Sequence, residues 1–288
     1  MTGNDVEEQL SRGADLADEM LEEQTRRRNA VADRPGVLIA EGDSWFDYPR
    51  YDIVKRLERQ HGWDVESVAH YGDNLESMAY DRAQLDPLTR AFLRVRDRGE
   101  VPRGLLLSGG GNDFAGPELA MLLDHAGSGH GGVNNVIRDE LVQVRLKEAW
   151  AHLLGFTTRL GTSQFGAPVR TVVHGYAYPW PDGRPFLDVG PFEIGPWLAP
   201  SYARKGLGSN TRQGLEERRE LTIALMDEYN EMLARLVEEP GLEHVVYVDL
   251  RNVMTSPDYR DDWDNELHPT RSGFDKIALE IHDAVVAT

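Results

Sequence analysis

The sequence contains no cysteine among its 288 residues. This absence excludes disulfide scaffolds, zinc sites built from thiolates, and cysteine nucleophiles. Long hydrophobic runs are missing as well, since no stretch approaches the roughly 18 apolar residues of a membrane-spanning helix. The N-terminal residues also lack the basic and then apolar pattern of a secretory signal. We therefore expect a soluble, cytoplasmic protein.

Positive charge is scarce. Lys and Arg total 31 against 49 Asp and Glu, which gives a formal net charge of −18. Nucleic-acid binding depends on Lys and Arg to neutralise phosphates, and an acidic surface also repels anionic membranes. We expect no nucleic-acid partner, although the charge alone names no substrate.

Three common motifs are missing from the places where they would act. No GxGxxG opens the first predicted helix, as in dinucleotide-binding folds, and no GxxxxGK[ST] loop is present to cradle phosphates. No serine lies in the GxSxG elbow of the general α/β-hydrolases. These absences disfavour the common types of nucleotide site and that hydrolase class.

Short apolar runs alternate with helical patterns from Pro35 onward. The runs cover 37–40, 65–69, 105–107, 169–173 and 245–248, and the helical patterns cover about 51–61, 75–98, 138–160, 215–238 and the residues after Pro269, where Ser272 is the expected cap. Runs that are apolar on both faces are typical of strands covered by helices on both sides. The alternation predicts a single domain over 1–288 with a three-layer α/β/α fold and a flavodoxin-like five-stranded parallel sheet.

Three segments lie outside this alternation. Residues 1–34 have the amphipathic pattern of an N-terminal helical extension, and residues 114–137 form a glycine-rich loop. Residues 176–210 hold seven of the 24 aromatic residues and six of the 15 prolines. A long irregular loop of this kind is often a lid or a binding wall. Tyr178 and Trp180 in this segment, and Trp45, are the candidate substrate-binding residues.

Residues with a possible role in catalysis follow four of the predicted strands. Ser44 comes after the first run, Gly72 after the second, Asn112 after the third, and His268 after the last. Because ligands bind beyond the carboxyl ends of an open parallel sheet, we expect these groups to meet. A serine is a weak nucleophile until a base such as histidine accepts its proton. The backbone N–H of Ser44, Gly72 and the Asn112 amide can stabilise the resulting oxyanion.

These segments resemble the blocks of the SGNH, or GDSL-type, hydrolases. The matching residues are Gly42-Asp43-Ser44, Gly72, Gly110-x-Asn112-Asp113 and His268, and the resemblance spans about residues 37–282. It implies hydrolysis of carboxylic esters through a serine-bound acyl intermediate, without a cofactor or metal. The implied substrate is a small-molecule, acylated-glycan or lipid ester.

One position departs from the family pattern. The family usually places its triad Asp three residues before the His, and here that residue is Asn265. An amide can orient an imidazole, but it cannot stabilise an imidazolium as a carboxylate does. Three arrangements are open: Asp264 replaces the triad acid, Asp262 reaches the ring, or a Ser–His dyad works with Asn265 or a backbone carbonyl as orienter.

Two other functions fit parts of the pattern. A metal-dependent phosphoesterase could use Asp43, Asn112, Asp113 and His268 as ligands, since hard cations favour oxygen donors. That reading leaves Ser44 and the three successive glycines without a purpose. The other candidate is a non-catalytic ligand-binding module on a flavodoxin-like fold. If the protein is an esterase, we expect Asp43 and Asp113 to have structural roles, with their carboxylates stabilising the backbone of their loops.

Overall fold

The computed structural model describes residues 34–189, 192–209 and 211–287. The chain divides into two units, residues 1–36 and 37–288. The division falls close to the predicted end of the N-terminal helical extension, nearly all of which lies outside the described residues. The sheet and its helices belong to the second unit.

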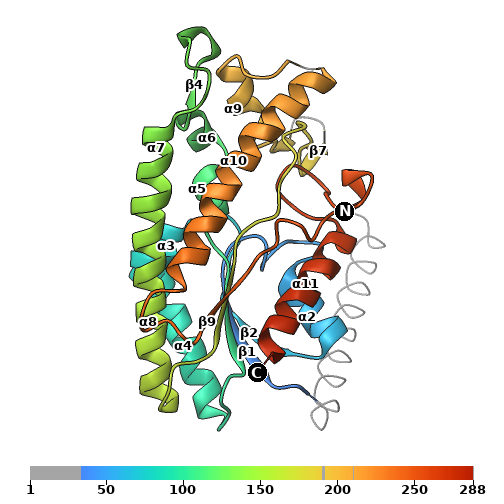
Figure 1. Cartoon of the computed structure of the whole chain (residues 1–288). Helices are drawn as coiled ribbons and strands as arrows, with labels where there is room; N and C mark the ends of the chain where they lie inside the picture. The colour runs from blue at the N-terminus through green and yellow to red at the C-terminus, as the bar shows by residue number, and fades with distance from the viewer. Residues whose placement is uncertain (1–33, 190–191, 210, 288) are drawn as a thin grey trace, which may run out of the picture. The chain divides into compact units, whose positions relative to one another are not determined.

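Five parallel strands form the central sheet (Figure 1). They are β1 (Val37–Glu41), β2 (Asp64–Ser67), β3 (Gly104–Leu107), β6 (Thr171–His174) and β9 (Val245–Val248). Their order is β2-β1-β3-β6-β9, and every neighbouring pair is parallel. This is the flavodoxin-like order, so the predicted fold class is confirmed.

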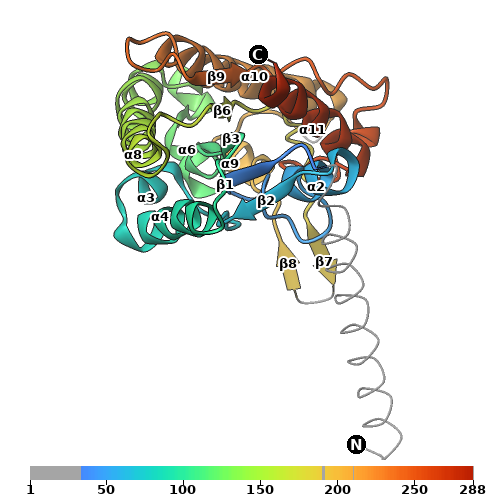
Figure 2. The same cartoon turned by 90° about the horizontal axis from the view of Figure 1, so that it is seen from below.

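Helices cover both faces of this sheet (Figure 2). On one face lie α2 (Ile53–His61) and α11 (Arg271–Val286), and on the other lie α3 (Leu75–Tyr80), α4 (Arg82–Asp97) and α8 (Lys147–Phe165). A long helix, α10 (Arg212–Leu236), packs against α8. Within the described ranges, no helix combines the length and apolarity needed to cross a membrane.

Burial distinguishes the central strands from one edge. β1, β3 and β6 are buried throughout, as expected for strands with helices on both sides. β2 is only half-buried and ends at Ser67, so the predicted run 65–69 is not a fully covered strand. The difference follows from its edge position and from the charged side chains of Asp64 and Glu66.

Three helical predictions differ from the structure in detail. The pattern over 75–98 splits at Asp81, whose carboxylate accepts the Ala83 N–H at 2.8 Å and caps α4. The pattern over 138–160 begins earlier, as α7 (Asn135–Asp139), and passes through a π-helical stretch, η3 (Glu140–Leu146), into α8. Thr270, and not Ser272, caps α11, because the helix already begins at Arg271.

Both insertions contain regular structure. Residues 111–133 form α5 (Gly111–Phe114), α6 (Pro117–Met121), the hairpin strands β4 (Leu123–Asp124) and β5 (Gly132–Val133), and the turn η2 (Ala126–Ser128). Residues 176–210 contain a second hairpin, β7 (Leu187–Val189) and β8 (Phe192–Ile194), followed by α9 (Ala199–Arg204). A last short turn, η4 (Tyr259–Asp261), precedes the loop that carries His268. The expectation that 176–210 is irregular throughout is therefore wrong.

Candidate active site

Ser44 lies in a tight turn directly after β1. The carbonyl of Asp43 accepts the N–H groups of Phe46 and Asp47 at 3.0 and 3.1 Å, which closes the turn. Gly42 is required here, since a Cβ at this position would come within 2.8 Å of the Ser108 side chain. The turn thus packs closely against the end of β3.

The Asp43 carboxylate holds this turn in place. One oxygen accepts the Trp45 N–H and the Ser108 hydroxyl, both at 3.0 Å, and the other accepts the Tyr176 hydroxyl. Asp43 is buried, so these donors take the place of water. The carboxylate therefore has the backbone-holding role that the sequence suggested.

Ser44 contacts His268, which lies 224 positions further along the chain. The hydroxyl oxygen is 2.8 Å from Nε2, and the ring is only 6% exposed. Burial lowers the pKa of His268 to about 3, because the charged ring would lose its hydration. At neutral pH the ring is therefore neutral, and Nε2 can accept the Ser44 proton.

Asn265 is the residue at the other ring nitrogen, with Oδ1 3.0 Å from His268 Nδ1. The same oxygen accepts the backbone N–H groups of Leu267 and His268, each at 3.0 Å. The two backbone donors identify this atom as the amide oxygen, and Nδ2 donates to the Tyr48 hydroxyl at 3.0 Å. Nδ1 therefore carries the proton, which leaves Nε2 free to face Ser44.

The carboxylate of neither proposed aspartate contacts the imidazole ring of His268. Asp264 accepts a hydrogen bond from the Tyr48 hydroxyl at 3.1 Å, and Asp262 pairs with Lys276 at 2.7 Å. The Tyr48 ring stacks on the His268 ring, with 4.3 Å between centroids and 14° between planes. Burial and, secondarily, the nearby Asp264 charge raise the pKa of Tyr48, which keeps its proton. The Asp264 carboxylate is thus linked to the ring through Tyr48 and Asn265, while the Asp264 backbone N–H donates to the His268 carbonyl at 2.9 Å.

The sequence predicts three oxyanion donors, at Ser44, Gly72 and Asn112. In the part of the chain that the structure describes, the backbone N–H groups of Ser44 and Gly72 make no hydrogen bond. The Asn112 amide donates one hydrogen to the Asp73 carbonyl at 2.8 Å, which leaves the second free. This bond ties Asn112 to the loop that carries Gly72, whose φ of 86° is in the left-handed region.

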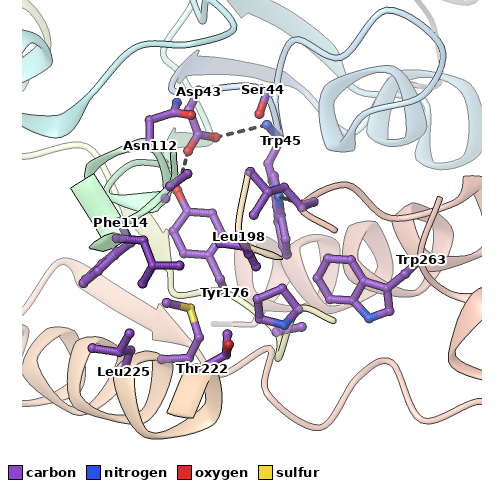
Figure 3. A pocket seen from close by; sticks show the side chains of 17 residues that line it. Asp43, Ser44, Trp45, Asn112, Phe114, Tyr176, Leu198, Thr222, Leu225 and Trp263 are labelled. Atoms are coloured by element: carbon purple, nitrogen blue, oxygen red, sulfur yellow. Dashed lines mark hydrogen bonds between the residues drawn. The ribbon is translucent and has the colours of Figure 1, made fainter. Parts of the chain in front are cut away.

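A cavity of about 580 Å³, counted with its mouth, opens beside Ser44 (Figure 3). Its walls come from the turn that carries Ser44, α5 and α6, two parts of the insertion, α10 and the loop that carries His268. Trp45 is one of the wall residues, and its indole N–H donates to the Leu267 carbonyl at 3.0 Å. This bond joins the Ser44 turn to the His268 loop.

The structure corrects the two aromatic candidates of the insertion. Tyr178 donates its hydroxyl to Asp227 at 2.6 Å, and Trp180 stacks on Tyr259 with 3.9 Å between centroids. Neither borders the cavity, whereas their neighbours Tyr176, Ala177 and Pro179 do. The insertion therefore contributes residues to the cavity wall, but Tyr178 and Trp180 are not among them.

Glu266 is a structural residue that the sequence analysis missed. Its fully buried carboxylate accepts four backbone N–H groups of the insertion at 2.6–3.0 Å, those of Gly183, Trp197, Leu198 and Ala199. Arg184 adds bonds to the carbonyls of Trp263 and Asp264 at 2.8 and 3.1 Å. The insertion is thus fastened to the loop that carries His268.

The residues of the metal hypothesis do not form a ligand cluster. Among the described residues, no three His, Asp or Glu side chains are grouped to hold a metal ion. Asp43 is occupied by its three donors, and Asp113 accepts the Leu75 N–H at 3.0 Å. Burial raises the pKa of Asp113 to about 6.

The chain has structural neighbours but no match in sequence. No family model matches it, and no curated protein matches it. The lipase Lip_vut3 from a goat rumen metagenome superposes with a TM-score of 0.54 at 11% identity, over 86% of this chain and 96% of the lipase.

Two further structures have lower scores. A Slackia heliotrinireducens protein, provisionally described as an SGNH hydrolase, has a TM-score of 0.47 at 12% identity and covers 86% of this chain and 98% of its own. The carbohydrate acetylesterase Est24 from Sinorhizobium meliloti has 0.46 at 12% identity, with 87% and 98% covered. With the strand order and the four segments at the strand ends, this chain has an SGNH-type hydrolase fold.

Proposed function

We propose that this protein is a serine hydrolase of carboxylic esters, with Ser44 as nucleophile and His268 as general base. The contact of 2.8 Å between Ser44 Oγ and His268 Nε2 is the observation that carries the proposal. Nucleophile and base within hydrogen-bond reach, with a third group orienting the base, are the arrangement that nucleophilic catalysis requires.

The proposed reaction has two steps, acylation of Ser44 and hydrolysis of the acyl-serine. Ser44 Oγ bonds to the ester carbonyl carbon while its proton passes to His268 Nε2. The oxyanion is stabilised by the N–H groups of Ser44, Gly72 and Asn112. The C–O bond to the alcohol then breaks, and the leaving oxygen takes the proton from Nε2. Water attacks the acyl-serine in the same way, gives its proton to Nε2, and releases the carboxylic acid as Ser44 recovers its hydrogen.

Asn265 has the position of the triad acid in this proposal. Its oxygen keeps the proton on Nδ1, so the ring has the correct tautomer, but a neutral amide adds little stabilisation to the imidazolium. Asp264 supports it indirectly: the carboxylate orients the Tyr48 hydroxyl, whose oxygen accepts the Asn265 N–H. Tyr48, Asp264 and Asn265 are positioning residues that act on His268.

The test is Ser44→Ala, assayed on p-nitrophenyl butanoate. We expect kcat to fall by at least about 10⁴-fold, as for other serine nucleophiles. Ser163→Ala is the matched control, because that serine is exposed on α8 and remote from His268 in sequence. Near wild-type turnover by a folded Ser44→Ala variant would refute the proposal. Loss of wild-type activity with a chelator would favour a metalloenzyme instead.

A further inference from the structure

The cavity beside Ser44 is predominantly apolar. Its lining residues are Asp43, Ser44, Trp45, Gly111, Asn112, Phe114, Ala115, Leu119, Tyr176, Ala177, Pro179, Leu198, Thr222, Leu225, Met226, Trp263 and Leu267. Ser44 and Asn112 lie at one end of this group, and Thr222 and Leu225 of α10 lie at the other (Figure 3). The cavity thus leads away from the nucleophile into apolar side chains.

Two polar side chains of its walls, those of Thr222 and Tyr176, are already paired. At the far end, the Thr222 hydroxyl donates to the Arg218 carbonyl at 2.8 Å and is 2.7 Å from the Tyr202 hydroxyl. The Tyr176 hydroxyl donates to Asp43. A ligand in the cavity therefore meets hydrocarbon, and a sugar or a charged group there would lose water without gaining partners.

The positions of Ser44 and His268 determine which half of an ester can enter the cavity. The leaving oxygen must approach His268 Nε2, from which it takes its proton. Among the described residues, Ser44 borders the cavity and His268 does not. The carbonyl oxygen faces the N–H donors of Ser44 and Asn112. The acyl chain is the remaining substituent of the carbonyl carbon, and the cavity is the space left for it.

We infer that the enzyme binds the acyl chain of its ester in this cavity and prefers longer acyl chains, such as hexanoate, to acetate. The inference rests on the proposed function and adds the acyl class to it. A longer chain extends from Ser44 toward Thr222 and Leu225 at the other end of the cavity, and each CH₂ group buried there is worth about fourfold in kcat/KM, or about 0.8 kcal/mol.

The experiment measures kcat/KM for p-nitrophenyl acetate, butanoate, hexanoate and decanoate. We expect a rise of about 10²-fold from acetate to hexanoate in the wild type, from the per-CH₂ value over four groups. Leu225→Trp fills the far end of the cavity and should lower the ratio of hexanoate to acetate hydrolysis at least tenfold. Leu221→Trp is the matched control on α10, because Leu221 does not border the cavity.

A second variant enlarges the same position. Leu225→Ala should raise the ratio of decanoate to hexanoate hydrolysis severalfold, and it tests the inference even where the tryptophan variant does not fold. A wild type that prefers acetate would overturn the inference, as would Leu225 variants with an unchanged chain-length profile. If acetate hydrolysis still requires Ser44, only the acyl cavity is refuted. If it does not, the proposed function itself fails.

Discussion

Replacing Asn265 by Asp tests the reasoning about the histidine directly. The new carboxylate would replace an amide oxygen that lies 3.0 Å from His268 Nδ1. With charges about 4 Å apart and an effective dielectric constant of about 20, the attraction to an imidazolium is about 4 kcal/mol. That energy corresponds to about 3 pKa units. The pKa of His268, which burial lowers to about 3, should therefore rise to about 6 in Asn265→Asp.

The pH dependence of ester hydrolysis shows this shift. The base must be neutral in the free enzyme, so kcat/KM falls as the pH drops below the pKa of His268. We expect the wild type to have nearly equal kcat/KM at pH 5 and pH 8. In Asn265→Asp, the value at pH 5 should be about tenfold below the value at pH 8, since a pKa of about 6 leaves one ring in eleven neutral.

The same substitution should raise kcat at pH 8, because the carboxylate stabilises the imidazolium that forms in the transition state. About 10³-fold is the ceiling set by 4 kcal/mol, and repulsion from the neighbouring Asp264 lowers the gain. Asn265→Ala is the control, which should lose kcat and keep the flat pH profile. An Asn265→Asp enzyme with the wild-type profile would refute the view that Asn265 governs the charge on His268.

Two stability predictions follow from buried carboxyl groups. Burial, with the Asp73 charge as a smaller cause, raises the pKa of Glu41 to about 8, so the folded state holds a proton that the unfolded state releases above about 4.5. The contribution of this group to the free energy of unfolding is fully present below pH 4.5 and is lost as the pH rises to about 8. The loss amounts to as much as several kcal/mol. In urea unfolding, Glu41→Gln should therefore be more stable than the wild type at pH 8 and differ little from it at pH 4. An equal difference in the free energy of unfolding at both pH values would contradict this prediction. Glu266→Gln leaves backbone N–H donors of the insertion unpaired and should lower the free energy of unfolding by about 3–5 kcal/mol. A loss below about 1 kcal/mol would show that the four hydrogen bonds do not hold the insertion.

The sheet and the order of the reactive residues could be predicted because they depend on local patterns. Buried parallel strands read as short apolar runs, and ligands collect at their carboxyl ends. The strand order and the contact of Ser44 with His268 agree with that reasoning. The split at Asp81 and the cap at Thr270 were missed because several neighbouring residues could have capped the helices, and only the path of the backbone selects one.

The histidine's partner could not be predicted from spacing. The choice of Asn265 over Asp264 depends on two backbone N–H groups that orient the amide and on Tyr48, which is more than 200 positions away. Glu266 was missed because an acid in an acidic loop looks solvated in a sequence. Its burial depends on an insertion that begins some 90 residues earlier and contacts it only in the folded chain.

The four bonds of Glu266 limit how this enzyme can be altered. An insertion at the mouth of an active site is usually treated as exchangeable between homologues, since it lies outside the sheet. Here, deleting or swapping residues 183–199 would leave a carboxylate without donors in a position that is 0% exposed, two residues before His268. An exchange of this segment therefore has to include position 266, and a change in the insertion is transmitted to the loop that carries His268.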